Sequence, residues 1–350
     1  VIKGPASALY GSNAIHGVIN VITPDTTQGT GQFALDYGSY GFHRAKLQQG
    51  KDFGSSGVGI AASLTRDTGY RNDEGVDQEK VSLRHRIEWD STVITSGLTY
   101  THLDQETAGY IEGFESYKST ELARSNPNPE AFRNAKSLRI WSKFNTSFDG
   151  GHGLSITPYL RNQDMRFRMH FLPGKPLEEN AQKGVGVLSQ FNYIVNDYVS
   201  LDLGIDAEYT EGELVQSQQG ATEGSAFLVE TIPSGKHYDY DVDAALIAPF
   251  FALNWQHEKW DVSFGGRFES MQYDYTNNMN VGRVREDGTQ CGFGGCRYSR
   301  PADSSNDFDS FSPKLSLRYQ LSGSTQLFGG LARGYRAPQA TELYRLQRAQ

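Results

Sequence analysis

The sequence lacks any long hydrophobic run. Its longest apolar stretch, Ala244 to Leu253, is only ten residues long and contains Pro249. A helix that crosses a membrane needs about 20 apolar residues, and the mean hydropathy of the chain is −0.55. These values exclude transmembrane helices. They leave transmembrane β-strands open, because the residues of such strands face lipid and lumen alternately and are polar on average.

Positive charge and cysteine are scarce. Lys and Arg number 33 against 41 Asp and Glu, and the net charge of −8 with no basic block argues against nucleic acid as a partner. The two cysteines, Cys291 and Cys296, flank a Gly-Phe-Gly-Gly loop. A pair that closes so small a loop favours a disulfide formed outside the cytoplasm. Half of a metal site is the alternative, but no histidine lies nearby in the sequence.

Catalytic motifs are missing as well. Serines near histidines lack a strand-turn-helix context, and no Cys/His set has metal-ligand spacing. The sequence therefore predicts no enzymatic activity, no cofactor and no metal site. It has neither an initiating methionine nor a signal peptide. Because an exported protein needs a signal peptide, we expect that the chain lacks its true beginning.

Alternation of apolar and polar residues is the dominant pattern. From Val199 to Tyr209 every second residue is apolar and the intervening ones are polar or glycine. Strict period two predicts a strand with one apolar and one polar face. The pattern recurs in four further segments: Val58–Leu64, Leu154–Arg161, Trp260–Glu269 and Leu315–Leu321.

The connections between these segments alternate in length. Short ones are expected at 50–57, 90–92, 149–153, 196–197, 256–259 and 322–324, and long ones at 67–78, 103–136, 162–184, 211–243 and 271–313. Aromatic residues gather beside the short turns, namely Trp89, Tyr198, Trp255 and Trp260. Short turns on one side, long loops on the other and an aromatic girdle are typical of an outer-membrane β-barrel.

Counting the segments predicts about thirteen strands. An odd, open set leaves two unpaired edges, which a lipid bilayer does not tolerate. Plugged transporters have about 22 strands. We therefore expect an antiparallel transmembrane barrel that is truncated at both ends, with about 13 of its strands present.

The first residues form a glycine-rich motif. Gly4-Pro5 predicts a turn with Pro5 opening a short helical segment, Gly11 can end that segment, and Val18–Thr23 is typical of a buried strand. The motif resembles the end of the plug domain of TonB-dependent outer-membrane receptors, an α/β domain. Lys3 and His16 depart from the family pattern. The match is carried by Gly4, Pro5, Ala6, Ser7, Leu9, Tyr10, Gly11, Ser12, Ala14, Gly17, Val18, Ile19, Asn20, Ile22 and Thr23.

The last residues carry a second match to the same family. They resemble its mid-barrel signature through Arg336, Ala337, Pro338, Glu342, Leu343 and Tyr344. The resemblance implies that residues 1–28 end a plug domain and that residues 29–350 begin a barrel. It further implies location in the outer membrane among outer-membrane lipids, and energy supplied by the TonB complex of the inner membrane, whose binding segment we expect to be missing here.

The resemblance also implies a transport function. Members of the family take up a scarce nutrient, most commonly a ferric siderophore, while cobalamin, haem or oligosaccharide stay open. A passive outer-membrane channel or an adhesin barrel is the main alternative, although neither needs a folded domain before its first strand. A soluble all-β carbohydrate-binding protein is a third possibility, and its apolar faces would be packed against each other.

One basic and aromatic run is the best candidate for contact with a ligand. It spans Arg161 to Phe171, and we expect it to rise from a strand into a long external loop. Arg161, Arg166, Arg168 and His170 can bind an anionic chelate, and Phe167 can pack on its apolar parts. The alternative is an ordinary loop whose arginines pair with nearby acids or with lipopolysaccharide phosphates.

Two groups of charges have simpler interpretations. The acidic runs Asp239–Asp243 and Asp303–Asp309 offer oxygen ligands for calcium, but neither follows a complete binding-loop pattern, so solvated loops are favoured. Other charges have lumen-facing parity and are expected to contact the plug or lumenal water. They are Arg84, Arg86, Glu88, Arg139, Lys143, Asp202, Asp206 and Glu208.

Overall fold

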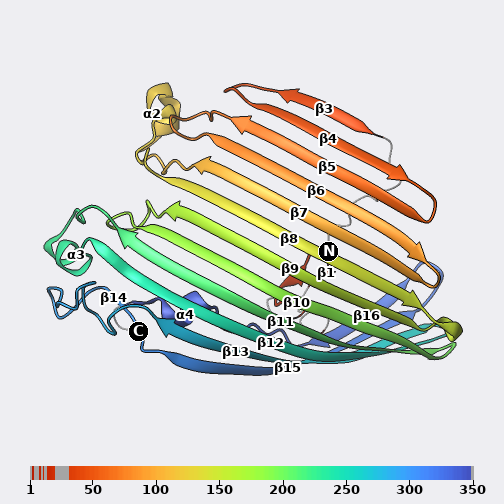
Figure 1. Cartoon of the computed structure of the whole chain (residues 1–350). Coiled ribbons are helices and arrows are strands. Elements are labelled where there is room, and N and C mark those ends of the chain that lie inside the picture. The colour runs from red at the N-terminus through yellow and green to blue at the C-terminus, as the bar shows by residue number, and fades with distance from the viewer. Residues whose placement is uncertain (1, 4–7, 9–10, 12–13, 20–30, 348–350) are drawn as a thin grey trace.

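The computed structural model describes residues 2–3, 8, 11, 14–19 and 31–347. Its main feature is one sheet of 13 strands in the order β16-β15-β13-β12-β11-β10-β9-β8-β7-β6-β5-β4-β3 (Figure 1). The strands are β3 (Gln32–Tyr37), β4 (His43–Asp52), β5 (Ser56–Asp67), β6 (Val76–Trp89), β7 (Thr92–Glu106), β8 (Phe132–Ser147), β9 (Gly153–Arg168), β10 (Leu177–Asn196), β11 (Val199–Gln218), β12 (Gly235–His257), β13 (Trp260–Asn277), β15 (Ser304–Gln320) and β16 (Gln326–Ala332).

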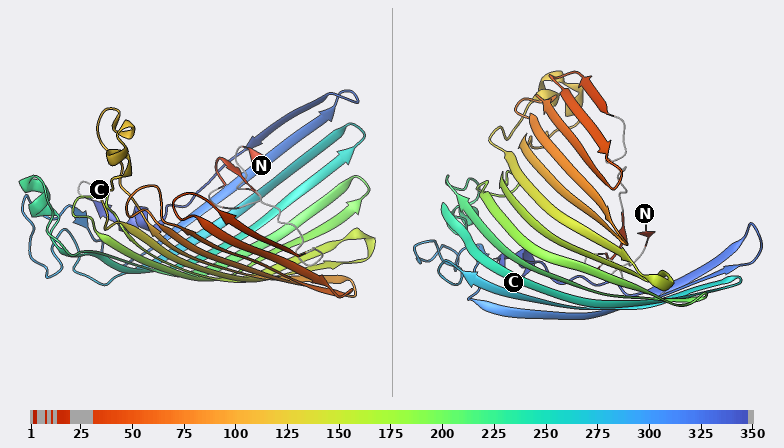
Figure 2. Two further views of the ribbon diagram at one scale, coloured as in Figure 1. Left: turned by 90° about the horizontal axis from the view of Figure 1, so that it is seen from above. Right: turned by 45° about the vertical axis from the view of Figure 1, so that its right-hand side comes forward.

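All neighbouring strands of this sheet are antiparallel and follow one another along the chain, with β14 of another sheet lying in sequence between β13 and β15. The sheet curves into an open trough (Figure 2). Within the described residues its edges are β3 and β16. The predicted antiparallel β fold, its strand number and its short turns are confirmed.

The remaining elements are short. They are β1 (Ile2–Lys3), β2 (Gly17–Val18), β14 (Tyr298–Ser299), β17 (Leu346–Gln347), the helices α2 (Thr120–Arg124), α3 (Ala226–Thr231) and α4 (Ala340–Tyr344), and the single 3₁₀ turns η1 (Ser116–Lys118) and η2 (Asp149–Gly151). No helix among the described residues is long and apolar enough to cross a membrane.

The two faces of the sheet differ as the alternation predicts. On β11, Leu203 and Ile205 point to the convex face and are 43% and 44% exposed. Asp206 points to the opposite face, where it forms an ion pair with Arg267 of β13. Polar side chains line this concave face, while the four aromatics beside the short turns, Trp89, Tyr198, Trp255 and Trp260, are exposed.

The long connections are shorter than the hydrophobic pattern predicts. Their bounds are 68–75, 107–131, 169–176, 219–234 and 278–303. The prediction of a long loop at 162–184 is wrong, because β9 runs on to Arg168 and β10 already begins at Leu177. Backbone hydrogen bonds between strands do not require apolar side chains, so pairing continues beyond the segment in which the apolar face shows the period of two.

A core of aromatic residues lies at the loop end of the concave face. Tyr344 of α4 stacks on Tyr275 of β13 with ring centroids 4.2 Å apart. Strand β14 pairs with β17, so the 278–303 loop and the end of the chain are held together there. The buried members of this core are Leu214, Tyr238, Tyr240, Val242, Tyr275, Cys291, Cys296, Tyr298 and Tyr344.

Candidate functional site

The basic run 161–168 lies on β9 and its side chains alternate between the two faces. Arg161 and Phe167 share the concave face with Tyr159, whereas Arg166 and Arg168 share the convex face with Leu160. The structure therefore does not bring the three arginines together. Their role in ligand binding stays a prediction, and of the predicted residues on β9 itself Arg161 and Phe167 are those that face the inside of the trough.

Arg161 belongs to a polar group on the concave wall. Its Nη2 donates to the Glu208 carboxylate and, at 3.1 Å, to Oγ1 of Thr210. The hydroxyl of Tyr159 donates to the same carboxylate. The Arg139 guanidinium lies 5.3 Å from the Tyr159 ring centroid. These contacts fix a cation on the wall of the trough.

Arg166 and Arg168 have local partners outside the trough. Nε of Arg166 lies 3.0 Å from Oε1 of Glu179, and its guanidinium lies 5.7 Å from the Phe132 ring centroid. Nη1 of Arg168 donates to the carbonyl oxygen of Lys175 at 3.1 Å. These contacts agree with the alternative in which the run pairs with nearby groups.

The 169–176 connection folds back towards the concave side. Met169 is 3% exposed, and its sulfur accepts from Nη2 of Arg345 at 3.2 Å and from Nε2 of Gln216 at 3.5 Å. The His170 ring meets the Phe171 ring edge-on at 5.7 Å. Among the described residues, Nδ1 of His170 is buried without a hydrogen-bond partner.

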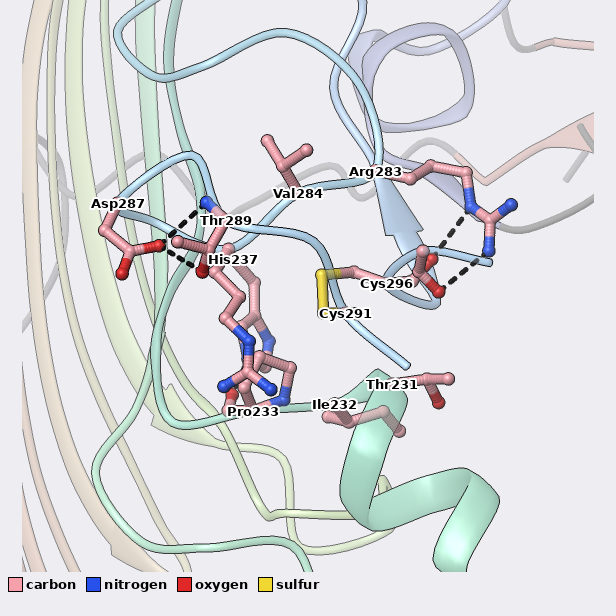
Figure 3. The surroundings of a disulfide bond; sticks show 12 residues. Thr231, Ile232, Pro233, His237, Arg283, Val284, Asp287, Thr289, Cys291 and Cys296 are labelled. Atoms are coloured by element: carbon pink, nitrogen blue, oxygen red, sulfur yellow. Dashed lines mark hydrogen bonds between the residues drawn. A yellow bond between two sulfur atoms is a disulfide. The ribbon is translucent and has the colours of Figure 1, made fainter. Parts of the chain in front are cut away.

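The 278–303 loop is tied together by a disulfide and by arginines. Cys291 and Cys296 are joined, and Arg283 donates to the carbonyl oxygens of Cys296 at 2.8 Å and of Gly295 at 2.9 Å (Figure 3). The end of α3 lies beside the disulfide (Figure 3), where the backbone N–H of Arg297 donates to Thr231. Hydrogen bonds from Thr289 lower the pKa of Asp287 in the same loop.

Arg300 is the anchor of this loop. It is 1% exposed and donates to the carbonyl oxygens of Asn280, Val284 and His237 at 2.7, 2.7 and 3.0 Å. Its charge is compensated by these carbonyl dipoles, since no carboxylate is paired with it among the described residues. Arg300 therefore connects the loop to β12.

The signature near the end of the chain builds α4 and its cap. Nη2 of Arg336 donates to Oε1 of Glu342 at 2.8 Å, and the backbone N–H of Gln339 donates to Oε2 at 2.8 Å. The hydrogen bond from Gln339, followed by that from Arg336, lowers the pKa of Glu342. Pro338 precedes the helix, and Tyr344 at its end fills the aromatic core. Arg336 and Glu342 therefore stabilise the start of α4, and Tyr344 joins the helix to the wall.

Part of the opening motif lies within the described residues. Gly17 pairs with Lys3 in the β1–β2 ladder, and Gly11 has the positive φ of +77° expected of a glycine that ends a helical turn. A Cβ placed on Gly11 would lie 3.3 Å from Nη2 of Arg267. Gly11 therefore sits against the concave wall. The other predicted plug residues Gly4, Pro5, Tyr10 and Asn20 lie outside the described residues.

The acidic runs form ordinary polar contacts. Asp239 is ion-paired with Lys236 at 2.7 Å, and Nδ2 of Asn278 donates to Asp241 at 2.8 Å. Within the described ranges, no group of three or more His, Cys, Asp or Glu is placed to hold a metal ion. The interpretation as solvated polar residues fits these contacts.

Comparison with known protein families shows which family the chain belongs to. Residues 21–348 match the family described as TonB dependent receptor-like, beta-barrel. The chain belongs to the TonB-dependent receptor family. Members of this family are receptors and transporters of the outer membrane. The resemblance predicted from the two end motifs is thereby confirmed.

Individual relatives of this receptor chain are partial matches. Over 78 residues, 22% of the chain, it is 41% identical to the vitamin B12 transporter BtuB of Vibrio vulnificus (strain CMCP6), and the match covers 12% of that protein. The ferric citrate transporter FecA in its unliganded form is similar with a TM-score of 0.72 at 15% identity, covering 94% of this chain and 48% of FecA.

Two further solved receptors show the same fold. The ferric-catecholate import receptor Fiu from E. coli K12 has a TM-score of 0.72 at 12% identity, covering 96% of this chain and 59% of Fiu. The copper transporter OprC has a TM-score of 0.70 at 14% identity, covering 98% of this chain and 51% of OprC. The receptor chain therefore spans about half the length of these solved structures.

Sequence reasoning missed the residues that the loops of this receptor bring together. Arg345, His237, Tyr238 and Arg297 come from separate segments yet line one cavity. No linear motif connects them. The only sequence signal is the closeness of Arg297 to the predicted disulfide.

Proposed function

We propose that the protein containing this chain takes up a ferric siderophore or a similar metal chelate across the outer membrane, driven by the TonB complex. The contact between Gly11 and Arg267 carries the proposal of energy coupling. Gly11, which belongs to the motif that resembles a plug end, lies beside this arginine of the inner wall, and this supports a plug inside the barrel. A passive channel or an adhesin barrel has no need of a folded segment at that position.

The character of the wall supports movement of a plug past it. The concave face carries ionic and hydrogen-bonding groups such as the Arg161–Glu208 pair. When a plug moves away, such groups form hydrogen bonds with water in place of those with the plug. The net cost in free energy is therefore modest. An apolar contact of equal area would hold a plug in place, since its exposure to water is unfavourable.

The proposed ligand class rests on the names of the similar structures and on the loops. FecA is named for ferric citrate, Fiu for ferric catecholate and OprC for copper, so each of these three receptors is named for a metal-containing cargo. The loop end of this chain offers guanidinium groups beside aromatic rings. That combination suits an anionic chelate with apolar or aromatic parts.

The test uses cells that express the whole gene and a matched strain without it. Accumulation of ⁵⁵Fe supplied as ferric citrate and as a ferric catecholate is measured with and without TonB. We expect accumulation that depends on both the receptor and TonB. Accumulation that persists without TonB would instead indicate a passive channel. If neither iron complex accumulates while labelled cobalamin does, the ferric chelate is the wrong ligand class.

A further inference from the structure

We infer that the loop cavity, defined here as the space lined by Leu172, Pro173, Pro176, Gln216, Ile232, His237, Tyr238, Arg297, Tyr298, Arg345 and Gln347, binds one carboxylate-sized anionic group of the transported chelate. The inference rests on the proposed function, because it names the chemistry recognised by the same receptor. It concerns a site at the loop end that the predicted run 161–171 does not contain.

Several segments that are far apart in sequence build the loop cavity. The 169–176 connection supplies Leu172 and two prolines, the ends of β11 and β12 supply polar and aromatic groups, and the 278–303 loop and the end of the chain supply one arginine each. The disulfide, Arg300 and the β14–β17 pairing hold the last two segments in place. Because the walls are fixed by these contacts, the cavity is formed before any ligand arrives.

The electrostatic balance of the loop cavity favours an anion. Arg297 is exposed and makes no ion pair among the described residues. Arg345 lies 2.9 Å from Oε2 of Glu178, and the two side chains are 22% and 6% exposed. Arg300 lies directly behind the wall, 5.2 Å from the Tyr298 ring centroid. Two guanidinium groups, those of Arg297 and Arg345, thus line the cavity, and only Arg345 is paired with a carboxylate among the described residues, that of Glu178.

The aromatic and histidine groups give the loop cavity a rigid wall that does not compete for the anion. His237 stacks on Tyr298 with centroids 4.5 Å apart. Its Nε2 lies 2.7 Å from the carbonyl oxygen of Pro233, and since a carbonyl only accepts, this nitrogen carries the hydrogen. The Tyr238 hydroxyl donates to the carbonyl oxygen of Leu346. The guanidinium groups of Arg297 and Arg345 are therefore the cationic groups that can bind a carboxylate in the cavity.

Size limits the ligand to a small group. The loop cavity has a volume of about 80 Å³, while sites for a whole drug-sized molecule measure about 300–1,000 Å³. A cavity volume of this kind needs to be only about 10–15 Å³ to hold one water molecule. The space therefore accommodates a carboxylate or an oxyanion of similar size, and the remainder of a chelate would lie in the trough outside it.

The test measures binding of citrate to the purified whole receptor by isothermal titration calorimetry at fixed ionic strength, with the neutral triamide of citrate as the comparison ligand. Wild type should bind citrate and not the triamide. Arg297→Gln should weaken citrate binding at least tenfold, because a charge-assisted hydrogen bond is lost. Arg124→Gln, which changes an exposed loop arginine outside the cavity, should leave binding unchanged.

A change at Glu178 should strengthen citrate binding, the reverse of the effect expected for Arg297→Gln. Glu178→Gln removes the carboxylate that competes for Arg345, so citrate should bind several-fold more tightly. Ile232→Trp, which fills the space without changing charge, should abolish binding. A gel assay that detects the folded barrel identifies variants that fail to assemble, and these are left out of the comparison. Equal binding of citrate and triamide by wild type, or wild-type citrate affinity in both Arg297→Gln and Ile232→Trp, would overturn the inference.

The outcome is separable from that of the proposed function. If ⁵⁵Fe accumulation requires TonB while these variants bind citrate normally, the loop cavity is not the anion site although the transporter stands. If citrate binding follows the expected pattern but no metal chelate accumulates, the anion site stands and the proposed uptake fails.

Discussion

Trp141 of β8 lies flat across the backbone of Gly97, its direct partner on β7. A Cβ on Gly97 would come within 2.5 Å of Cε2 of the indole. The same arrangement recurs along the concave face, where a bulky side chain covers the glycine paired with it on the next strand. The other pairs are Tyr159 with Gly186, Arg161 with Gly184 and Phe250 with Gly204. These glycines let large side chains lie along the wall.

Gly97→Ala should therefore destabilise the folded barrel by about 1–3 kcal/mol, the usual cost of inserting atoms into a packed contact. Gly323→Ala is the matched control, because no atom lies within 4 Å of a Cβ at that position. Urea unfolding of both variants in lipid vesicles measures the difference. A Gly97→Ala variant as stable as the control would show that the indole moves aside at no cost.

The same positive charge should cost much more stability on the convex face than on the concave face. Leu203→Arg adds it on the convex face, where we expect a cost of about 2–4 kcal/mol near the membrane midplane. Gln190→Arg adds it on the concave face beside Asp202, whose Oδ1 lies 3.0 Å from Nε2 of Gln190, and should cost far less. Unfolding of the two variants in vesicles gives the comparison. Equal penalties would contradict the assignment of the convex face to lipid.

Cys291 and Cys296 should be oxidised in protein isolated from the outer membrane. Labelling with a thiol reagent before and after reduction measures this, and labelling without reduction would reopen the possibility of a metal site. Replacing both residues with serine should lower the free energy of unfolding of the loop by about 2 kcal/mol, because the disulfide no longer restricts the entropy of the unfolded loop. Limited proteolysis should then cut within residues 278–303 first.

Strand number and side-chain direction could be predicted because alternation on β11 and β13 is strict and the short turns are compact. Strand ends could not, because the face of β9 that is apolar up to Leu160 carries Asn162, Asp164 and Arg166 beyond it, and only backbone pairing shows that β9 continues. On a strand with a period of two, Arg166 and Arg161 point to opposite faces of the sheet. The interpretation of the run as a loop missed this difference. The loop cavity was beyond sequence reasoning, since pairing of β14 with β17 and other tertiary contacts bring Arg297 and Arg345 to one cavity.

Glu342 should titrate below its ordinary pKa of 4.5. Since the folded state lowers this pKa, the contribution of Glu342 to the stability of α4 is complete above about pH 4.5 and is lost as the pH falls through the lowered value. A ¹³C NMR titration of labelled glutamate carboxyls, assigned with Glu342→Gln, measures it. Arg336→Gln should move the pKa upwards. A pKa at or above 4.5 in wild type would contradict the cap described here.

Arg267 should be the most sensitive charged residue of the concave wall. Its Nη1 lies 2.7 Å from Asp206 and its Nε 3.4 Å from Glu269, and the Arg267 side chain is 4% exposed. Removing one member of a buried ionic group leaves charges without compensation, so Arg267→Met should cost about 3–5 kcal/mol. The Arg318–Asp261 pair on the same face is 50% and 37% exposed.

Arg318→Met is accordingly the control for Arg267→Met and should cost about 0–1 kcal/mol, because solvent screens an exposed pair. Arg267→Lys keeps the charge but loses the planar guanidinium group that reaches two carboxylates. Its loss of stability should therefore lie between those of the two methionine variants. Unfolding by guanidinium chloride in detergent gives the free energy of unfolding of all three variants. If Arg267→Met is no less stable than Arg318→Met, Asp206 and Glu269 do not depend on this guanidinium.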